Sequence, residues 1–374
     1  MDLPHLLLTN KKRGWNGEAA MIAELARGLA RRSYRVTVAT NPQATIIERL
    51  AGVDIEILRL TLLKEIPKIA WTLPNDIRHL AKYIYEQNVR LVHSNASFDT
   101  WTSALAISRY RLGVPLIRTK HNVKRIRTNW TNRWYYGKAI NHLIAPSHAV
   151  VEDLQRSEII SNDKINYIPY GIPIDKIEIY RNGRSDARRA LEIPDDAEVV
   201  SYISRLTRRK DPGTLVRAAL QVAKTRPNLR LLVVGGGNAG LRAELENIAT
   251  GSSVVEFWGH RDDVPRILAA TDIFVLPSLT EAFGLAPLEA MLQGVATIVS
   301  DAEGFRDFVE DGINGLVFPK GDIAALAHAI ERVFSDVELR NKIAVAGECT
   351  VRERFFAERM VDDIEKLYCR VLDK

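Results

Sequence analysis

Short apolar runs alternate with longer amphipathic stretches along most of the chain. Residues 6–9 form an apolar run, residues 18–32 repeat apolar side chains at helical spacing, and residues 36–39 form the next apolar run. This order of strand, helix and strand is typical of parallel sheets that carry helices on both faces. The strands predicted in the first half of the chain are 6–9, 36–39, 90–93, 116–119 and 143–145.

The alternation is interrupted at residues 168–175, where two prolines and a glycine favour a connector. A second series follows, so the sequence predicts an α/β protein with two doubly wound domains, residues 1–170 and 171–350. We expect residues 351–374 to form an amphipathic C-terminal helix that returns toward the first domain. Doubly wound sheets bind ligands at the carboxyl ends of their strands, so a ligand is expected in a cleft between the two domains. The second series comprises strands at 199–203, 229–234, 254–258, 273–276, 297–299 and 315–318, and helices at 212–224 and 241–250.

A helix is predicted soon after the strand at 273–276, because Pro287 suits its first turn and Gly294 suits its end. The amides that precede Pro287 then point out of a helix N-terminus, which favours anions and hydroxyl groups. These amides belong to Phe283, Gly284 and Leu285.

Two glutamates, Glu281 and Glu289, frame this helix N-terminus at a separation of eight residues. An ionised carboxylate accepts hydrogen bonds at two oxygens and therefore suits a pair of neighbouring sugar hydroxyls. We expect Glu289 to bind a ribose and Glu281 to bind a hexose. The alternative is a pair of solvated glutamates, which the surrounding Pro-Ser, Phe-Gly and Glu-Ala-Met motifs disfavour.

The segment from Glu281 to Glu289 resembles the E-x7-E signature of the retaining glycosyltransferases of family 4 (group 1), which have the GT-B fold. The resemblance extends over nearly the whole chain. It implies two Rossmann-like domains facing a central cleft, with a nucleotide-sugar donor bound by residues 171–350 and the acceptor bound by residues 1–170. It also implies that the sugar is transferred with retention of its anomeric configuration, and a UDP-sugar is the expected donor.

A second segment of the resemblance is Ile-Ser-Arg-Leu at 203–206 followed by Lys210. It implies that Arg205 and Lys210 hold the donor diphosphate and neutralise its charge as the leaving group, a role that suits two cations at a strand end. No Asp-x-Asp pair follows a strand as it does in metal-dependent sugar transferases. We therefore expect a metal-independent enzyme without a cofactor, in which Arg205, Lys210, Glu281 and His121 are the catalytic residues.

Further matches fall in the first half of the chain. Asn16 and Gly17 stand where the family has a Gly-Gly turn, which implies that Gly17 lies against the diphosphate. Asparagine tolerates left-handed conformations, so Asn16 is compatible with such a turn. His121 matches the family histidine that contacts the donor sugar. Pro-Tyr-Gly around Tyr170 replaces the usual Pro-Asn-Gly connector. Residues 301–307 depart from the usual Gly-Gly-x-x-Glu, which removes a guide to the donor sugar.

Two other functions compete with sugar transfer. Residues 235–240 match the dinucleotide fingerprint G-x-G-x-x-G, and Glu256 follows at a suitable distance for a ribose. An NAD-dependent oxidoreductase is disfavoured because this motif falls in the second βαβ unit of its domain and Glu256 falls within a predicted strand. A catalytically silent nucleotide-sugar-binding protein of the same fold is the other alternative, and the intact set of Arg205, Lys210, Glu281 and Glu289 disfavours it.

The charge of the chain is uneven. Residues 1–175 carry 25 Lys and Arg against 15 Asp and Glu, whereas residues 176–374 carry 27 against 31. Residues 120–138 mix six cations with four aromatic residues, a pattern that suits an anionic membrane surface or a phosphorylated lipid. A solvated basic face with aromatics packed inward is the alternative, and no nucleic-acid motif is present.

The acceptor expected from this charge is a lipopolysaccharide core or another envelope glycan or glycolipid. The sequence contains no run of about 18 apolar residues and no signal peptide at its start. We therefore expect a cytoplasmic protein that associates peripherally with the inner membrane.

Overall fold

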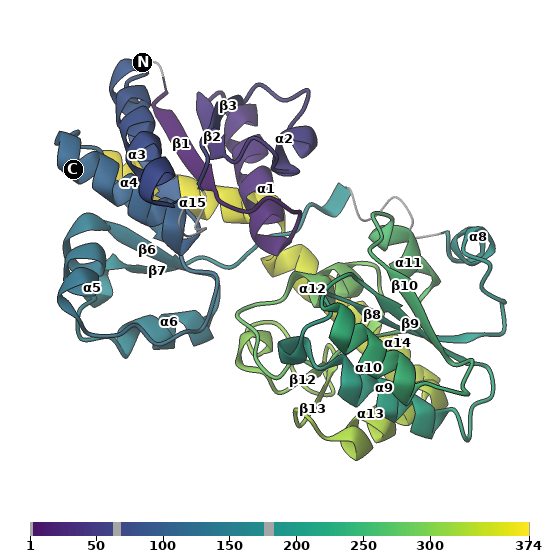
Figure 1. Cartoon of the computed structure of the whole chain (residues 1–374). Helices are drawn as coiled ribbons and strands as arrows, with labels where there is room; N and C mark the ends of the chain where they lie inside the picture. Colours follow the sequence, from purple (N-terminus) through teal and green to yellow (C-terminus); the bar gives the residue numbers. More distant parts are fainter. Residues whose placement is uncertain (1–2, 63–68, 176–182, 374) are drawn as a thin grey trace. The chain divides into compact units, whose positions relative to one another are not determined.

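The computed structural model describes residues 3–62, 69–175 and 183–373 (Figure 1). It contains two compact units, each with its own parallel sheet. The first unit comprises Met1–Gly171 together with Ala357–Lys374, and the second comprises Ile172–Phe356. Within the described ranges, no helix combines the length and the apolar character needed to span a membrane.

The first unit is built around a seven-stranded sheet with the order β3-β2-β1-β4-β5-β6-β7. Its central strands are almost fully buried, as their continuous apolar runs predict for a sheet covered on both faces. The direction of the strand order reverses between β1 and β4, which is where doubly wound sheets open a crevice. The strands are β1 (His5–Asn10), β2 (Val36–Thr40), β3 (Glu56–Arg59), β4 (Val89–Ser94), β5 (Leu116–Thr119), β6 (His142–Ala145) and β7 (Ile165–Tyr167).

The first helix, α1 (Gly17–Arg31), begins at an N-cap formed by Asn16, whose side chain accepts a hydrogen bond from the Ala19 amide at 3.0 Å. Asn16 does not use the left-handed conformation that asparagine tolerates, because its backbone is extended, with φ −158°. An extended N-cap lets the asparagine satisfy a helix amide that has no intrahelical partner. The other helices of the unit are α2 (Ile46–Arg49), α3 (Ile69–Glu86), α4 (Ser97–Tyr110), α5 (Trp130–Trp134), η1 (Tyr135–Ala139), α6 (His148–Gln155), η2 (Asn162–Lys164) and α15 (Ala357–Leu372).

Helix α15 packs against α1, as the yellow and purple helices of Figure 1 show. Gly28 makes this close approach feasible, because a Cβ there would lie 2.5 Å from a methyl carbon of Val361. Arg32 of the following turn pairs with Asp362 and Glu365. Apolar contact and ion pairing together attach the end of the chain to the first unit.

The C-terminal helix begins later in the chain than predicted. Helix α14 ends at Arg354 and α15 begins at Ala357, with an extended break between them. At the break Phe355 is 1% exposed, and its carbonyl accepts a hydrogen bond from the Ile172 amide at 2.9 Å. Burial of an aromatic side chain and pairing with the connector thus replace the helical hydrogen bonds.

The second unit holds a six-stranded parallel sheet with the order β10-β9-β8-β11-β12-β13, which reverses between β8 and β11. Its strands are β8 (Glu198–Ile203), β9 (Leu229–Val234), β10 (Val255–Gly259), β11 (Ile273–Leu276), β12 (Ala296–Ser300) and β13 (Leu316–Phe318). Its helices are α8 (Arg184–Ala190), η3 (Arg208–Lys210), α9 (Pro212–Val222), α10 (Ala239–Ile248), α11 (Val264–Ala270), α12 (Leu285–Leu292), η4 (Glu303–Phe305), α13 (Ile323–Ser335) and α14 (Val337–Arg354).

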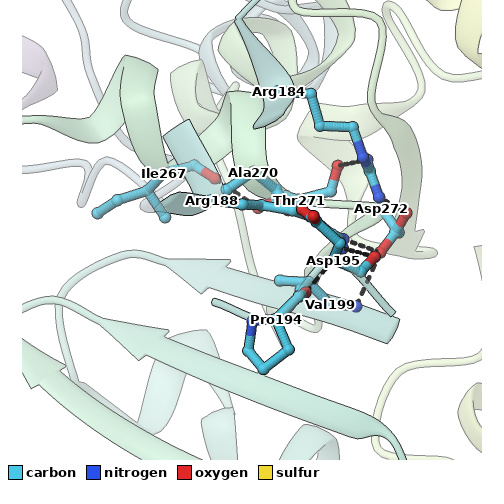
Figure 2. A network of polar contacts seen from close by, with 9 residues as sticks. All are labelled: Arg184, Arg188, Pro194, Asp195, Val199, Ile267, Ala270, Thr271 and Asp272. Carbon is cyan, nitrogen blue, oxygen red and sulfur yellow. Dashed lines mark hydrogen bonds and ion pairs between the residues drawn. The ribbon is translucent and has the colours of Figure 1, made fainter. Parts of the chain in front are cut away.

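A buried polar network attaches α8 to the centre of this sheet. Figure 2 shows Arg184 and Arg188 converging on Asp272, which directly precedes β11. Arg188 pairs with Asp272 at 2.9 Å, and the Val199 amide of β8 donates to the same carboxylate oxygen at 2.8 Å. Arg188 also donates to the carbonyl oxygen of Asp195 at 2.7 Å. The network therefore ties together the two strands between which the strand order reverses.

Candidate active site

The predicted donor residues of the second unit lie on the loops that follow β8 and β11, the two strands at the reversal of its sheet, and on α12, which follows the second of these loops. The loops are joined through the backbone, because the Leu279 amide donates to the Arg209 carbonyl at 2.8 Å. Sheets of this kind bind ligands at such a reversal. The two predicted motifs, distant in sequence, therefore meet at the position that the fold favours for a ligand.

Lys210 and Glu281 form an ion pair between these loops. Their side chains are only 14% and 9% exposed. The other oxygen of the Glu281 carboxylate accepts from the Ala282 amide at 3.2 Å, and the Ser278 hydroxyl lies 3.5 Å from the oxygen that Lys210 contacts. Both groups are therefore held in place before any ligand binds.

The loop that carries Glu281 is held from behind by η4. Gly284 has φ +99°, and a Cβ there would lie 2.8 Å from the Phe305 ring. A Cβ on Gly304 would lie 2.6 Å from the Glu281 carbonyl oxygen. Residues 301–307, which depart from the family pattern, thus support the loop directly through a glycine and a buried phenylalanine.

Glu289 lies on α12 and is half-buried. Desolvation raises the pKa of its carboxyl group to about 7. The helix ends as predicted, with Gln293 as its C-cap and Gly294 at φ +70°. A carboxylate whose pKa lies near neutrality is charged or neutral according to small changes in its surroundings.

The remaining predicted residues of this unit differ in exposure. Arg205 is exposed, and its carbonyl accepts from the Tyr202 hydroxyl at 3.1 Å. The Phe283 ring is buried against Phe308 and Phe355, with centroids 5.4 and 5.8 Å away, so only the backbone of Phe283 can face a ligand. Leu285 is the first residue of α12, whose N-cap position has no side-chain hydrogen bond.

Gly17 and His121 belong to the first unit. Gly17 is the exposed first residue of α1, and His121 follows β5. The Tyr170 hydroxyl is hydrogen-bonded to His121 Nδ1. Burial lowers the pKa of His121 to about 3, with a smaller contribution from the nearby His93, so the imidazole is neutral at physiological pH.

Glu18 is a further candidate site residue, to which the sequence pattern assigned no role. It lies at the second position of α1, and its side chain is 12% exposed and pairs with Lys12 at 3.4 Å. Its Oε1 has no hydrogen-bond partner within the described part of the chain. Burial raises the pKa of Glu18 to about 7. An acidic residue in a helix first turn is common, so the sequence alone carried no signal.

The basic and aromatic segment 120–138 is only partly a surface feature. Lys120 is buried and pairs with Asp153 at 2.5 Å. Three of the four aromatic residues pack inward: Tyr135 stacks on Trp101 with a centroid distance of 4.2 Å, and Trp134 and Tyr136 adjoin them. The exposed members are Trp130, at 81% exposure, and Lys124, Arg125, Arg127, Arg133 and Lys138.

The glycine-rich segment 235–240 serves the packing of its own sheet. A Cβ on Gly235 would lie 2.0 Å from the Ser204 carbonyl oxygen, and one on Gly237 would lie 2.5 Å from the Leu206 carbonyl oxygen. Glu256 is committed to Arg230 through contacts of 2.5 and 2.9 Å. The residues that suggested an NAD site are thus occupied by contacts within the protein.

Comparison with known families agrees with this geometry. Residues 183–348 match the model described as glycosyl transferases group 1, and residues 15–176 match the model described as glycosyltransferase family 4. Together the two matches take in nearly all of both units, and they define a glycosyltransferase. The chain belongs to the group 1 glycosyltransferases of family 4. The alternative of an NAD-dependent oxidoreductase is therefore wrong.

Similar proteins agree in class, and a similar solved structure agrees in fold. The chain is 35% identical over 178 residues to a lipopolysaccharide core biosynthesis glycosyltransferase, LpsE, of Rhizobium meliloti, covering 47% of this chain and 51% of that protein. It is 29% identical over 312 residues to an Escherichia coli UDP-Gal:alpha-D-GlcNAc-diphosphoundecaprenol alpha-1,3-galactosyltransferase, covering 77% of each. Anabaena HepE in complex with UDP and glucose superposes with a TM-score of 0.84 at 21% identity, covering 97% and 99%. The last likeness supports the GT-B fold.

Proposed function

We propose that this glycosyltransferase moves a sugar from a UDP-sugar to a lipopolysaccharide core or another envelope glycolipid, with retention and without a metal or cofactor. The observation that carries the proposal is the Lys210–Glu281 ion pair at the strand reversal of the second unit. It holds a cation suited to a diphosphate beside a carboxylate suited to sugar hydroxyls.

The donor assignment has further support within the second unit. Arg205 is exposed on the loop after β8, and the N-terminus of α12 lies on the loop after β11. Both favour the negative charge that develops on a leaving diphosphate. One similar protein is named for a UDP-sugar donor, and another is known in complex with UDP. We therefore assign the diphosphate to Arg205 and Lys210 and the ribose to Glu289.

The acceptor assignment rests on charge and on the named relatives. Lys124, Arg125, Arg127 and Arg133 are exposed, and none forms an ion pair with another residue of the described ranges. Cations of this kind attract phosphorylated glycolipids and anionic membrane surfaces. One relative is named for lipopolysaccharide core biosynthesis and another for a diphosphoundecaprenol-linked acceptor. We place the enzyme in the cytoplasm, bound peripherally to the inner membrane.

The test is donor binding followed by turnover. Thermal shift with UDP, GDP and ADP identifies the base, and UDP is expected to stabilise the protein most. The matching nucleotide sugars are then incubated in EDTA with short-chain lipopolysaccharide or diphosphoundecaprenol-linked sugars, and the anomeric configuration of the product is read by NMR. Preferred binding of another base, or an inverted product, would contradict the corresponding part of the proposal.

A further inference from the structure

His121 and Tyr170 form a stacked and hydrogen-bonded pair in the first unit. The Tyr170 hydroxyl is hydrogen-bonded to His121 Nδ1, and the ring centroids lie 5.8 Å apart at an interplanar angle of 30°. Tyr170 stands two positions before Ile172, where the second unit begins. The stacking and the hydrogen bond together fix both the place and the rotation of the imidazole ring.

The two nitrogens of His121 differ in their surroundings. Nδ1 is bound to Tyr170, whereas Nε2 is shielded from solvent and has no hydrogen-bond partner among the described residues. An unpartnered polar atom in a buried position is costly, so it calls for an explanation such as a catalytic role or a bound water. Nε2 is therefore the atom of this ring whose hydrogen bond the described residues leave unmet.

His93 provides an internal comparison, because it lines the same cavity of about 20 Å³. Its Nδ1 is hydrogen-bonded to the Tyr368 hydroxyl at 2.6 Å, and its Nε2 is hydrogen-bonded to the Thr119 hydroxyl at 2.7 Å. His93 and His121 are thus each hydrogen-bonded to a tyrosine, and of these two histidines only His121 keeps a nitrogen without a hydrogen-bond partner within the described ranges.

A neutral imidazole carries one N–H and one bare nitrogen, and the partner of one nitrogen decides the role of the other. Burial lowers the pKa of His121 to about 3, and the positive charges of Arg118 and Lys12 act in the same direction. The ring is consequently neutral throughout the working range of the enzyme. If the Tyr170 hydroxyl donates its hydrogen bond to Nδ1, Nδ1 is the bare nitrogen and the single ring proton must reside on Nε2.

We propose that Tyr170 is a positioning residue that holds His121 in the Nε2–H tautomer, so that this N–H is the group with which His121 binds an oxygen of the donor sugar. The inference rests on the proposed function and on the family resemblance, which implies that His121 contacts the donor sugar. His121 then acts as a hydrogen-bond donor, and neither a proton nor a covalent bond passes through it. Tyr170 acts only through His121 and has no contact with the sugar.

The kinetic test uses Tyr170→Phe, which removes the hydroxyl and keeps the ring. We expect kcat to fall about ten- to a hundredfold, because a misplaced contact at the reacting centre costs about that much. UDP affinity should be unchanged, since Lys210 and Glu289 belong to the second unit. In a His121→Ala background the same change should lower kcat by less than about twofold. Parental kcat in Tyr170→Phe, or a full additional loss in the double variant, would overturn the proposal.

Tyr368→Phe is the matched control, because it removes the corresponding hydroxyl from His93. It should lower the melting temperature and leave kcat within about twofold of the parent once both proteins are assayed folded. Equal loss of kcat in the two variants would mean that the hydroxyls only stabilise the unit, which would contradict a positioning role for Tyr170.

The tautomer is measured independently by NMR of protein labelled with ¹⁵N-histidine. The parent should show a protonated Nε2 and a bare Nδ1 for His121, and Tyr170→Phe should lose this preference. If the ring proton of His121 lies on Nδ1 in the parent protein, the proposal is overturned even if Tyr170→Phe folds poorly. An Nε2–H tautomer with parental kcat in Tyr170→Phe would assign Nε2 to a buried water and overturn the sugar contact. A parent that turns over no nucleotide sugar would instead reject the proposed function, and the NMR result would still stand.

Discussion

The Lys210 ammonium group and the Glu281 carboxylate form an ion pair that connects the loop after β8 to the loop after β11. Each group is more than four-fifths buried, so removing either one leaves the other as a poorly compensated charge. A bound diphosphate would compete with Glu281 for the lysine. In the free protein Lys210 is therefore paired with Glu281, and a bound donor must share the lysine with this carboxylate.

Lys210→Ala should lower turnover by about two orders of magnitude, by analogy with the loss of one transition-state donor. Arg208→Ala is the control, because Arg208 is exposed in the same loop and pairs with Glu244 outside the proposed site. Both are assayed at saturating UDP-sugar with and without EDTA. If the parent loses activity in EDTA and magnesium restores it, a metal ion neutralises the diphosphate in the role assigned here to Arg205 and Lys210.

Nucleotide affinity should depend on pH through Glu289. Its pKa in the free protein is raised to about 7, so the carboxyl group holds its proton below pH 7 and releases it above. The ribose hydroxyls bind the ionised form, which only accepts hydrogen bonds. Affinity for UDP should therefore rise about tenfold between pH 6 and pH 8, because the ionised fraction rises from about one tenth to about nine tenths.

Titration calorimetry of the parent and of Glu289→Gln separates this effect from the titration of the nucleotide phosphate, which is common to both. The glutamine variant should lack the additional rise. Glu289→Ala should weaken binding by roughly 1–3 kcal/mol at pH 8, because it leaves hydroxyl groups unpaired. Identical pH profiles for parent and glutamine variant would remove Glu289 from the ribose site.

The stability of the second unit should depend on the Arg188–Asp272 pair. Arg188→Ala removes a side chain that is 2% exposed and hydrogen-bonded to three backbone carbonyls. Breaking a buried pair costs about 3–5 kcal/mol, and we expect the lower end because Asp272 keeps Arg184. The melting temperature should fall by about 6–12 °C in calorimetry. Arg189→Ala, which removes an exposed arginine, should shift it by less than about 2 °C.

The sequence predicted the central strands well because they are buried on both faces and read as continuous apolar runs. It missed β3 and β7, the edge strands of the first sheet, which are short and only half-buried. Edge strands leave a weak pattern, since much of their surface faces water. The fold class was confirmed, while the break at Phe355 was missed because it depends on a contact with the distant Ile172.

The candidate site could be predicted from the sequence where a motif lies within one segment. It was less predictable where contacts join residues that are distant in sequence. The α12 segment with Glu289 behaves as its sequence indicates. Local patterns do not connect residues that are distant in sequence, so they did not indicate the Lys210–Glu281 pair or the Tyr170–His121 pair. For the same reason they did not indicate that Oε1 of Glu18 is buried. The inward packing of Tyr135 and Tyr136 was also hidden, because alternating cations and aromatics do not reveal which side chains face the core.

The last prediction concerns the exposed cations of the first unit. Changing Lys124, Arg125 and Arg127 together to Ser should weaken association with anionic vesicles about a hundredfold at low salt, because each cation near such a surface contributes about 1 kcal/mol. The effect should shrink at high salt, which screens it. The matched control removes the same charge from the second unit, at exposed Arg189, Arg217 and Lys224.

Co-sedimentation with vesicles containing anionic lipid gives the measurement, and UDP binding should be the same in parent, variant and control. Ile126 is 8% exposed between the changed residues, so it should keep the segment packed after the substitutions. Because Trp130 is the exposed aromatic of the segment, association should be reversible and without deep insertion. Two results would contradict the prediction: the variant sediments as much as the parent, or the parent does not sediment with the vesicles at low salt. Either result would show that this surface is solvated and does not bind the membrane.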